Sequence, residues 1–217
     1  MSEYLNILKQ FAVHADNSVD TFLLAGQKVQ MNSSVDAFVR RPDRLRANID
    51  GDQFYQEFYY DGKSVTLFGK KANYYASAEA PPIIEEALYH AEQSVGLVVP
   101  MADLLSRNSY NVLMDDVYSG IYVGLSKVRG TECHHLAFRG EETDWQVWVE
   151  NSDTPFPRKF VITSKWVTGA PQFVGLMNKW DISPQLKDDL LPLCRRKGPK
   201  RSISFPLWIS GTTNGFK

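Results

Sequence analysis

The densest group of potential metal ligands in the chain is the run Cys133, His134 and His135. In an extended strand, adjacent side chains point to opposite faces, so the two histidines cannot hold one metal ion together. The chain's other cysteine, Cys194, does not complete the CxxC spacing of a zinc site. We therefore expect no metal and no cofactor. The two thiols could form a disulfide only in an oxidising compartment outside the cytoplasm.

Glu141, Glu142 and Asp144 form an acidic group beside Trp145. A hydrolase that uses paired carboxylates needs them to face each other across a cleft, whereas acidic neighbours in a hairpin turn are more simply a solvated loop. The chain also contains no GxSxG elbow, no HExxH and no glycine-rich phosphate loop. We therefore expect that the protein is not an enzyme.

Arg41 stands directly before Pro42, and Asp61-Gly62 follows at the next predicted hairpin. Proline has no amide proton, so Pro42 belongs at a sheet edge or a bulge and not within a ladder. It also restricts Arg41 to extended geometry. Asp61-Gly62 supplies the positive φ angles of a tight hairpin. This stretch therefore predicts a sheet corner, with Arg41 as its one candidate functional side chain.

The elements that must position these residues are mostly short strands, rich in Val, Phe, Tyr and Leu and separated by turn residues. They are expected at residues 21–26, 28–32, 35–41, 45–49, 53–60, 64–68, 73–78, 120–128, 132–140, 143–151, 158–166 and 171–180. Such short links favour antiparallel neighbours, because a parallel crossover needs a dozen or more residues. The pattern therefore predicts antiparallel meanders.

Apolar residues at helical spacing predict an amphipathic helix over residues 3–14, with Ser2 as its N-cap. A second set at the same spacing, with glutamates near its N-terminus, predicts a helix over residues 82–94. One or two further short helices are expected between residues 100 and 115. Because no linker-like stretch divides the chain, we expect residues 1–217 to form a single domain.

Aromatic residues occupy both faces of several predicted strands. In the strand at 143–151, Trp145 and Val147 share one face, while Gln146 and Trp148 share the other. Apolar groups on both faces require that both faces be covered. Two interpretations remain open: an ordinary core capped by helices, or a cavity for an apolar ligand between a curved sheet and a helical lid.

The formal net charge of −1 argues against nucleic-acid binding, which needs a basic excess to neutralise phosphates. No apolar run approaches the ~20 residues that span a bilayer. Met1 leads directly into SEYLNILKQF, which lacks the basic and apolar regions of a signal peptide. This start indicates either a cytoplasmic protein or one whose export signal is missing from the sequence.

Seven segments, taken in order, resemble an uncharacterised family of bacterial predicted periplasmic proteins, a domain of unknown function. They are AGQKVQ (25–30), RRPDRLR (40–46), YYDGKSVTLF (59–68), NYYA (73–76), PMADLL (100–105), CHHLAFR (133–139) and DWQVWVE (144–150). The resemblance runs from about residue 3 to about residue 191. It implies a periplasmic location, since members of the family normally carry the signal peptide that this sequence lacks.

Arg41-Pro42 followed by Asp61-Gly62-Lys63 is also similar to a pattern in the LolA/LolB-type periplasmic lipoprotein carriers. This similarity implies an α+β fold: a strongly curved antiparallel sheet, or incomplete β-barrel, with helices covering its concave side over an apolar cavity. In the carriers, the arginine before that proline helps to tie the lid to the barrel. Arg41 would be its counterpart.

The resemblance implies a non-enzymatic periplasmic protein that binds a lipid, an acylated protein or another hydrophobic ligand between half-barrel and lid. The alternative is a periplasmic protein-interaction or sensor domain of the same fold without a bound ligand. We expect a monomer that makes peripheral membrane contact and binds no nucleic acid. The residues expected to bind the ligand or contact the lid are Arg41, Phe58, Tyr60, Leu67, Tyr75, Gln146, Trp148, Phe160 and Ile162.

Residues 192–217 depart from the family pattern, which typically ends in a strand led by a Phe-x-Pro-Pro-x-Gly-Ala-like segment. Here the segment carries six Lys or Arg, no acids and little strand alternation.

Codons can be chosen for Leu193 through Trp208 so that the frame displaced by one nucleotide reads VPPEGAETVDFLPFV, a family-like ending. We therefore predict that a one-nucleotide shift, real or a sequencing error, replaced the native C-terminal strand. It follows that Cys194 has no designed partner and that a sheet edge is left exposed. Resequencing the gene tests this, because codons incompatible with the displaced frame would contradict it.

Overall fold

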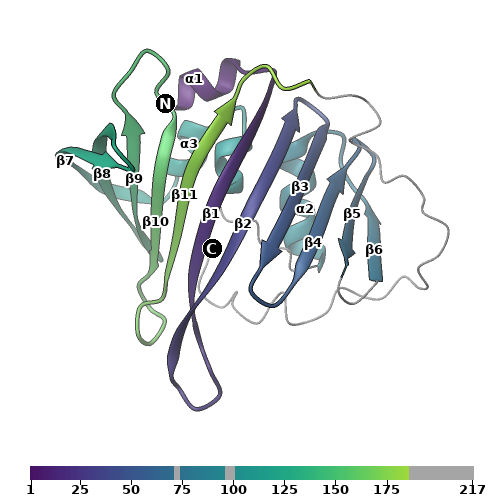
Figure 1. Cartoon of the computed structure of the whole chain (residues 1–217), viewed down its shortest axis with the longest axis horizontal. Coiled ribbons are helices and arrows are strands. Elements are labelled where there is room, and N and C mark those ends of the chain that lie inside the picture. Colours follow the sequence, from purple (N-terminus) through teal and green to yellow (C-terminus); the bar gives the residue numbers. More distant parts are fainter. Residues whose placement is uncertain (71–73, 96–100, 186–217) are drawn as a thin grey trace.

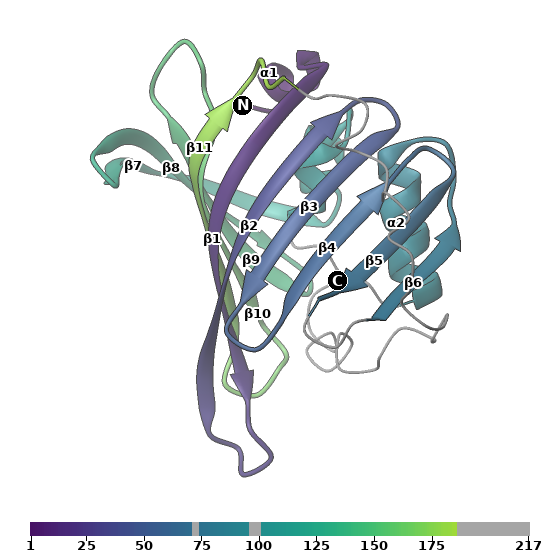
Figure 2. The same ribbon diagram turned by 45° about the vertical axis from the view of Figure 1, so that its right-hand side comes forward.

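The computed structural model describes residues 1–70, 74–95 and 101–185. Its eleven strands form one antiparallel sheet in the order β6-β5-β4-β3-β2-β1-β11-β10-β9-β8-β7. The sheet is strongly curved and open, and the helices lie on its concave side (Figures 1 and 2). The expected fold class, α+β with an incomplete β-barrel and covering helices, is confirmed. No helix in these described ranges is long and apolar enough to cross a membrane.

The strands agree with most of the runs predicted from sequence. Residues 28–32 and 35–41, however, belong to one continuous strand, and the strand predicted at residues 21–26 is wrong beyond residue 22, because residues 23–26 form a hairpin loop. The strands are β1 (Gln10–Phe22), β2 (Lys28–Arg40), β3 (Arg44–Gly51), β4 (Tyr55–Tyr60), β5 (Ser64–Gly69), β6 (Tyr74–Glu79), β7 (Val117–Val128), β8 (Thr131–Gly140), β9 (Thr143–Glu150), β10 (Pro157–Ser164) and β11 (Gln172–Asp181). The helices are α1 (Ser2–Ile7), α2 (Ile84–Val95), the 3₁₀ helix η1 (Ala102–Leu105) and α3 (Ser109–Met114).

The prediction of a helix over residues 3–14 is wrong beyond its first turns. Helix α1 ends at Ile7, its N-cap is Met1 and not Ser2, and β1 begins at Gln10. Strand β1 lies in the middle of the sheet and forms hydrogen-bonded ladders with both β2 and β11. Backbone ladders on both sides provide hydrogen-bond partners for this segment, so they outweigh a helical spacing of apolar residues.

The order of the strands explains why helices cross the concave face. Strands β1 to β6 form one meander and β7 to β11 another, and the two meanders meet where β1 pairs with β11. Strand β6, the last of the first meander, and strand β7, the first of the second, are therefore the two opposite edges of the sheet. The connection that joins these edges contains α2, η1 and α3, so it spans the sheet from side to side (Figure 2). We call α1, α2, η1 and α3 together the lid.

Two apolar clusters fill the space between the lid and the sheet. The α2 cluster consists of Phe11, Val39, Leu45, Phe58, Tyr60, Val65, Leu67, Ile84, Ala87, Leu88 and Ala91. The α1–η1 cluster consists of Leu5, Ala15, Leu104, Trp145, Val147, Phe156, Phe160 and Met177. Leu8, Val13 and Trp180 pack against both clusters, so the two form one continuous interior.

Candidate functional site

Arg41 lies at the corner between β2 and β3 and holds two parts of the lid. Its Nη1 donates to the carbonyl oxygens of Leu5 (3.0 Å) and Leu8 (2.8 Å), at the C-terminal end of α1. Its Nη2 donates to the carbonyl oxygen of Leu105 (2.8 Å), the last residue of η1. Carbonyls at a helix C-terminus carry partial negative charge, which a guanidinium complements. We call Arg41 and these three carbonyls the lid junction.

The residue after Arg41 extends the lid junction to the third lid element. The carbonyl oxygen of Pro42 accepts a hydrogen bond from the backbone N–H of Ile84, the first residue of α2 (2.9 Å). The backbone N–H of Arg41 itself donates to the carbonyl oxygen of Lys9 (2.8 Å), between α1 and β1. The Arg-Pro corner predicted from sequence therefore contacts α1, η1 and α2 at one point.

The charge of Arg41 is partly withdrawn from water. Burial lowers the pKa of Arg41, and the nearby carboxylate of Glu85 acts in the opposite direction. The guanidinium carbon also lies 5.4 Å from the ring centroid of Phe11, a cation–π distance. Because an arginine does not deprotonate in proteins, Arg41 remains a cation whose charge is offset by carbonyl dipoles, an aromatic face and one acid.

A second polar contact fixes the approach to α2. The hydroxyl of Tyr60 donates a hydrogen bond to the carbonyl oxygen of Pro81, just before the helix. Burial raises the pKa of Tyr60 to about 12, so the phenol keeps its proton at neutral pH and remains a donor. Strand β4 is thereby connected to the start of the lid.

The remaining predicted site residues on the concave face lie inside the two clusters. Phe58, Tyr60 and Leu67 belong to the α2 cluster and are at most 4% exposed. Phe160 belongs to the α1–η1 cluster, and Ile162 is partly buried against it. The structure therefore brings these residues together beneath the lid, but as packed side chains.

Gln146 and Trp148 do not share this surface, because alternate residues of β9 face opposite sides and Trp145 and Val147 take the side under the lid. Gln146 Oε1 lies 3.0 Å from His135 Nε2, and Trp148 stacks on the His135 ring at 3.9 Å between centroids. Tyr75 pairs with Phe68 through the backbone, but its side chain lies outside the described residues.

No feature of the sequence indicated which groups of the lid Arg41 would contact. The carbonyls of Leu5, Leu8 and Leu105 are backbone groups that any residue type would present. Met101 was also missed: a Cβ built at Gly175 would lie only 2.8 Å from Met101 Cε, so the methionine lies directly on the β11 backbone. A glycine within a strand is a known signal of such close approach, and it could have indicated this contact.

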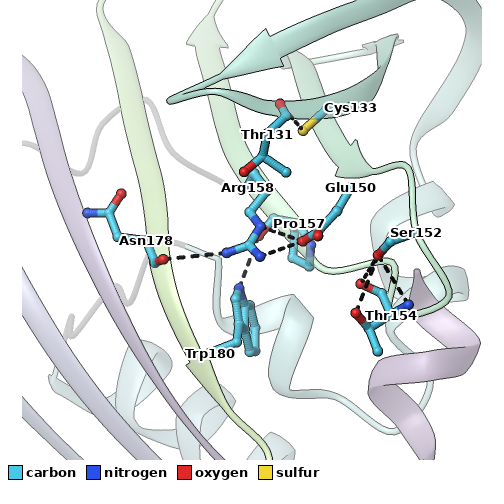
Figure 3. A network of polar contacts seen from close by, with 9 residues as sticks. All are labelled: Thr131, Cys133, Glu150, Ser152, Thr154, Pro157, Arg158, Asn178 and Trp180. Atoms are coloured by element: carbon cyan, nitrogen blue, oxygen red, sulfur yellow. Dashed lines mark hydrogen bonds and ion pairs between the residues drawn. The ribbon is translucent and has the colours of Figure 1, made fainter.

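Beside the α1–η1 cluster, a polar network joins the strands that carry it (Figure 3). Arg158 Nε donates to Glu150 Oε2 (2.7 Å), and Arg158 Nη1 donates to the carbonyl oxygen of Asn178 (3.4 Å). The indole N–H of Trp180 donates to the carbonyl oxygen of Pro157 (3.2 Å). These bonds link β9, β10 and β11 to one another, so the sheet side of the cluster is held independently of the lid.

The histidine, cysteine and acidic side chains of the described residues do not come together in a catalytic or metal site. Within the described ranges, no three His, Cys, Asp or Glu side chains lie close enough to hold a metal ion. His134 Nδ1 lies 3.0 Å from the hydroxyl of Tyr122, whereas His135 contacts Gln146 on the other face, as strand alternation predicted. Cys133 is a buried free thiol; Cys194 lies outside the described residues.

The two surface hollows that stand out in the described part of the chain lie away from the lid–sheet space. One, of about 480 Å³, is lined by polar residues of β1, β2 and β3, among them Asp16, Asn32 and Asp50. The other, of about 470 Å³, lies against the outer side of α2, at Tyr89 and His90. Between lid and sheet, the described side chains of the two clusters pack against one another, so the conformation seen here is a closed one.

Several solved structures are similar to this chain at low sequence identity. The lipoprotein LppX from Mycobacterium tuberculosis is 12% identical, with 85% of this chain and 92% of that chain covered and a TM-score of 0.50. LprF from Mycobacterium bovis is 13% identical over 86% and 92% of the two chains (TM-score 0.49). A LolA superfamily protein from Nitrosomonas europaea is 10% identical over 88% and 95% (TM-score 0.41). No curated protein matches the chain.

The sequence also matches a family model, described as "Predicted periplasmic protein (DUF2092)", over residues 1–192. The match ends where the atypical tail begins, and it confirms both the resemblance inferred from the seven segments and the periplasmic location. The chain belongs to this family of predicted periplasmic proteins.

Proposed function

We propose that the protein binds a hydrophobic ligand, such as a lipid or an acylated protein, without catalysis, in the space between the sheet and the lid. The observation that carries this proposal is that the lid is held to the sheet by widespread apolar packing but by few, localised hydrogen bonds. Its apolar side chains are buried in two clusters, while the polar attachment of α1 and η1 converges on one side chain, Arg41.

Apolar contacts and hydrogen bonds respond differently to a ligand. Burial of apolar surface is non-directional, so an acyl chain that displaces lid side chains can replace their contacts at roughly 0.8 kcal/mol per buried CH₂. A hydrogen bond from a guanidinium to a carbonyl is directional and is lost when the lid moves. The lid junction is therefore the element that sets how readily the closed form opens.

The part of the lid that opens is the part held by Arg41. Helix α1 has 6 residues and η1 has 4, whereas α2 has 12. Helices this short have little stability of their own and depend on tertiary contacts. Release of α1 and η1 would uncover the aromatic floor of the α1–η1 cluster, including Trp145 and Phe160. We place the ligand there.

A lipid ligand must be exchanged with a membrane, and the β1–β2 hairpin is suited to that contact. Its strands pair with each other as far as Phe22 and Lys28, whereas the β1–β11 ladder ends at Val19, so the hairpin projects beyond the sheet (Figure 1). Leu23 and Leu24 at its tip are 50% and 111% exposed. No charged residue occurs in the tip from residue 21 to 26. An uncharged aliphatic tip of this kind partitions into the acyl–headgroup boundary.

Native mass spectrometry and probe titration test the ligand proposal. We expect protein isolated from the periplasm to carry bound lipid, or delipidated protein to take up a fluorescent fatty acid saturably. Arg41→Leu should change the affinity for the fatty acid, because it shifts the balance between closed and open lid. Arg129→Leu, at an exposed ion pair with Asp16, should not. A lipid-free protein that takes up neither fatty acids nor phospholipids would rule the proposal out.

Vesicle flotation tests the membrane contact separately. The double substitution Leu23→Ser and Leu24→Ser should reduce binding to phospholipid vesicles, with fatty-acid uptake in solution unchanged. Val112→Ser, which alters an exposed apolar residue on α3, is the matched control. Equal flotation of both variants and the parent protein would show that the hairpin tip is not the contact.

A periplasmic protein-interaction or sensor domain of the same fold is the second candidate. The two packed clusters of side chains between lid and sheet favour it. The two candidates differ in their response to lipid: a ligand-binding protein is stabilised against heat by added fatty acid, since ligands that bind only the native state raise its stability. An interaction domain is not.

A further inference from the structure

Strand β7 forms one of the two edges of the sheet and pairs with β8 alone among the described strands. Figures 1 and 2 show no element beyond it. An edge strand presents a row of unpaired backbone N–H and C=O groups, and monomeric proteins protect such edges with charges, proline or β-bulges. From residue 117 to 126, β7 contains no charge and no proline, and its ladder with β8 shifts register only at Val117/Ser119 and Tyr122/Gly124. As far as the described residues show, the edge around Ile121 is therefore open to pairing.

The side chains of β7 are also exposed to an unusual degree for their type. Apolar side chains that are at least half exposed occur along the whole strand: Tyr118 (59%), Ile121 (65%), Tyr122 (58%), Val123 (52%) and Leu125 (55%). They lie on both faces, since Ile121 is opposite Ala137 and Tyr122 is opposite Leu136 on β8. A contiguous apolar strip of this kind marks an interaction surface.

The charges at the two ends of β7 have opposite signs. Asp115 and Asp116 stand just before the strand and Lys127 stands near its end, and all three are exposed. None of them forms an ion pair with any residue that the structure describes. A strand that is acidic at its start and basic at its end is complementary to a second copy of itself running antiparallel.

In place of the monomer expected from the sequence, we propose that β7 pairs antiparallel with β7 of a second copy, around a two-fold axis at Ile121, to form a homodimer. In this register Asp115 of one copy lies opposite Lys127 of the other, and Val117 lies opposite Leu125. Apolar side chains of the two copies then lie side by side on each face of the joined sheet. The interface is isologous, so the ion pair and the apolar pair each form twice.

The bulges of β7 limit this pairing to a dimer contact. The ladder with β8 shifts register at Val117/Ser119 and at Tyr122/Gly124. Bulges break regular pairing and bend the strand, so the regular part of the edge is the short stretch around Ile121. Apolar contacts and end charges therefore carry much of the recognition. Closed two-fold symmetry uses up both copies of the edge, so the contact does not propagate.

A membrane does not fit this surface. The acyl region offers no partner to the open N–H and C=O groups of the strand edge, whereas a second strand satisfies them. The inference does not depend on the proposed ligand function, since the lid junction lies on another part of the molecule.

Sedimentation velocity over a wide range of concentrations tests the dimer. We expect the parent chain to dimerise reversibly and Ile121→Lys to be monomeric, because two like charges would face each other on the axis. Ile7→Lys, at an exposed residue of α1, is the matched control and should dimerise like the parent. Circular dichroism confirms that each variant is folded.

Charge reversal identifies the register. Lys127→Asp should weaken dimerisation by roughly tenfold, because two attractive pairs become repulsive. Adding Asp115→Lys to it should restore dimerisation.

In a Cys194→Ser background, Ile121→Cys should form an intermolecular disulfide on mild oxidation, whereas Leu125→Cys, which faces Val117, should not. A parent chain that stays monomeric at all concentrations, or an Ile121→Lys dimer, overturns the proposal; a dimer that the charge pair fails to rescue overturns its register.

Discussion

The two clusters beneath the lid are built differently. The α2 cluster lies under a 12-residue helix, and its side chains Tyr60, Leu67 and Ile84 are at most 1% exposed. The α1–η1 cluster, which includes Trp145 and Phe160, lies under helices of only 6 and 4 residues. A long amphipathic helix is held by its own packed face, whereas short helices need an external tie. The lid therefore has a fixed part and a part whose position depends on Arg41.

Removal of a side chain from the α2 cluster should have the largest effect. We expect Leu67→Ala, at a residue that is 1% exposed, to lower the free energy of unfolding by roughly 2–5 kcal/mol, because it leaves a cavity between β5 and α2. Urea unfolding followed by circular dichroism measures this.

The contrast is Leu104→Ala in η1, which should change global unfolding less, since this part of the lid can detach while the sheet stays folded. Val112→Ala, at a 44% exposed residue, controls for the loss of an apolar side chain as such. Equal losses for Leu67→Ala and Leu104→Ala would show that the lid and sheet unfold as one unit.

Arg41→Leu should destabilise α1 and η1 locally and affect α2 less. Loss of hydrogen bonds from a charged donor costs about 1.5–3 kcal/mol, so amides of α1 and η1 should exchange with deuterium at least tenfold faster. Amides of α2 should be less affected, because that helix keeps its apolar face. Hydrogen exchange read by mass spectrometry measures both regions.

The matched control for Arg41→Leu is Arg129→Leu, which removes a surface arginine that is 58% exposed and pairs with Asp16. Exposed pairs contribute about 0–1 kcal/mol, so exchange in the lid should not change. Equal acceleration in α1, η1 and α2 would mean that Arg41 stabilises the whole fold and not one part of the lid.

The smallest expected difference is between two tryptophans of β9. Trp145 is 8% exposed in the α1–η1 cluster, whereas Trp148 lies on the outer face, stacked with His135 and 4.5 Å from the ammonium of Lys159. Acrylamide should therefore quench the fluorescence of a variant that keeps only Trp148 more strongly than one that keeps only Trp145. Equal quenching would contradict the assignment of the two faces.

Much of the sheet was predictable because a strand's signal is local. Residue preferences, period-2 alternation and turn residues each depend on only a few neighbouring positions. Gly62, whose φ is +82°, is one such turn residue. Strand β1 was not predictable on these grounds. Its apolar residues Phe11 and Ala15 are four apart, a spacing that fits a helix as well as a strand face, and only the ladders on both sides decided between them.

The candidate site, too, was only partly predictable from the sequence. The sequence by itself determined the Arg41–Pro42 corner, the separation of Trp145 from Trp148 onto opposite faces, and the family to which the chain belongs. Alternation fixes which residues share a face but not which face is inside, so the position of Gln146 was settled only by the packing of α1 and η1 on the other side. The carbonyls that Arg41 binds come from residues 33 to 64 positions away along the chain. Backbone groups carry no side-chain signal, so the tertiary structure alone could bring them to one guanidinium.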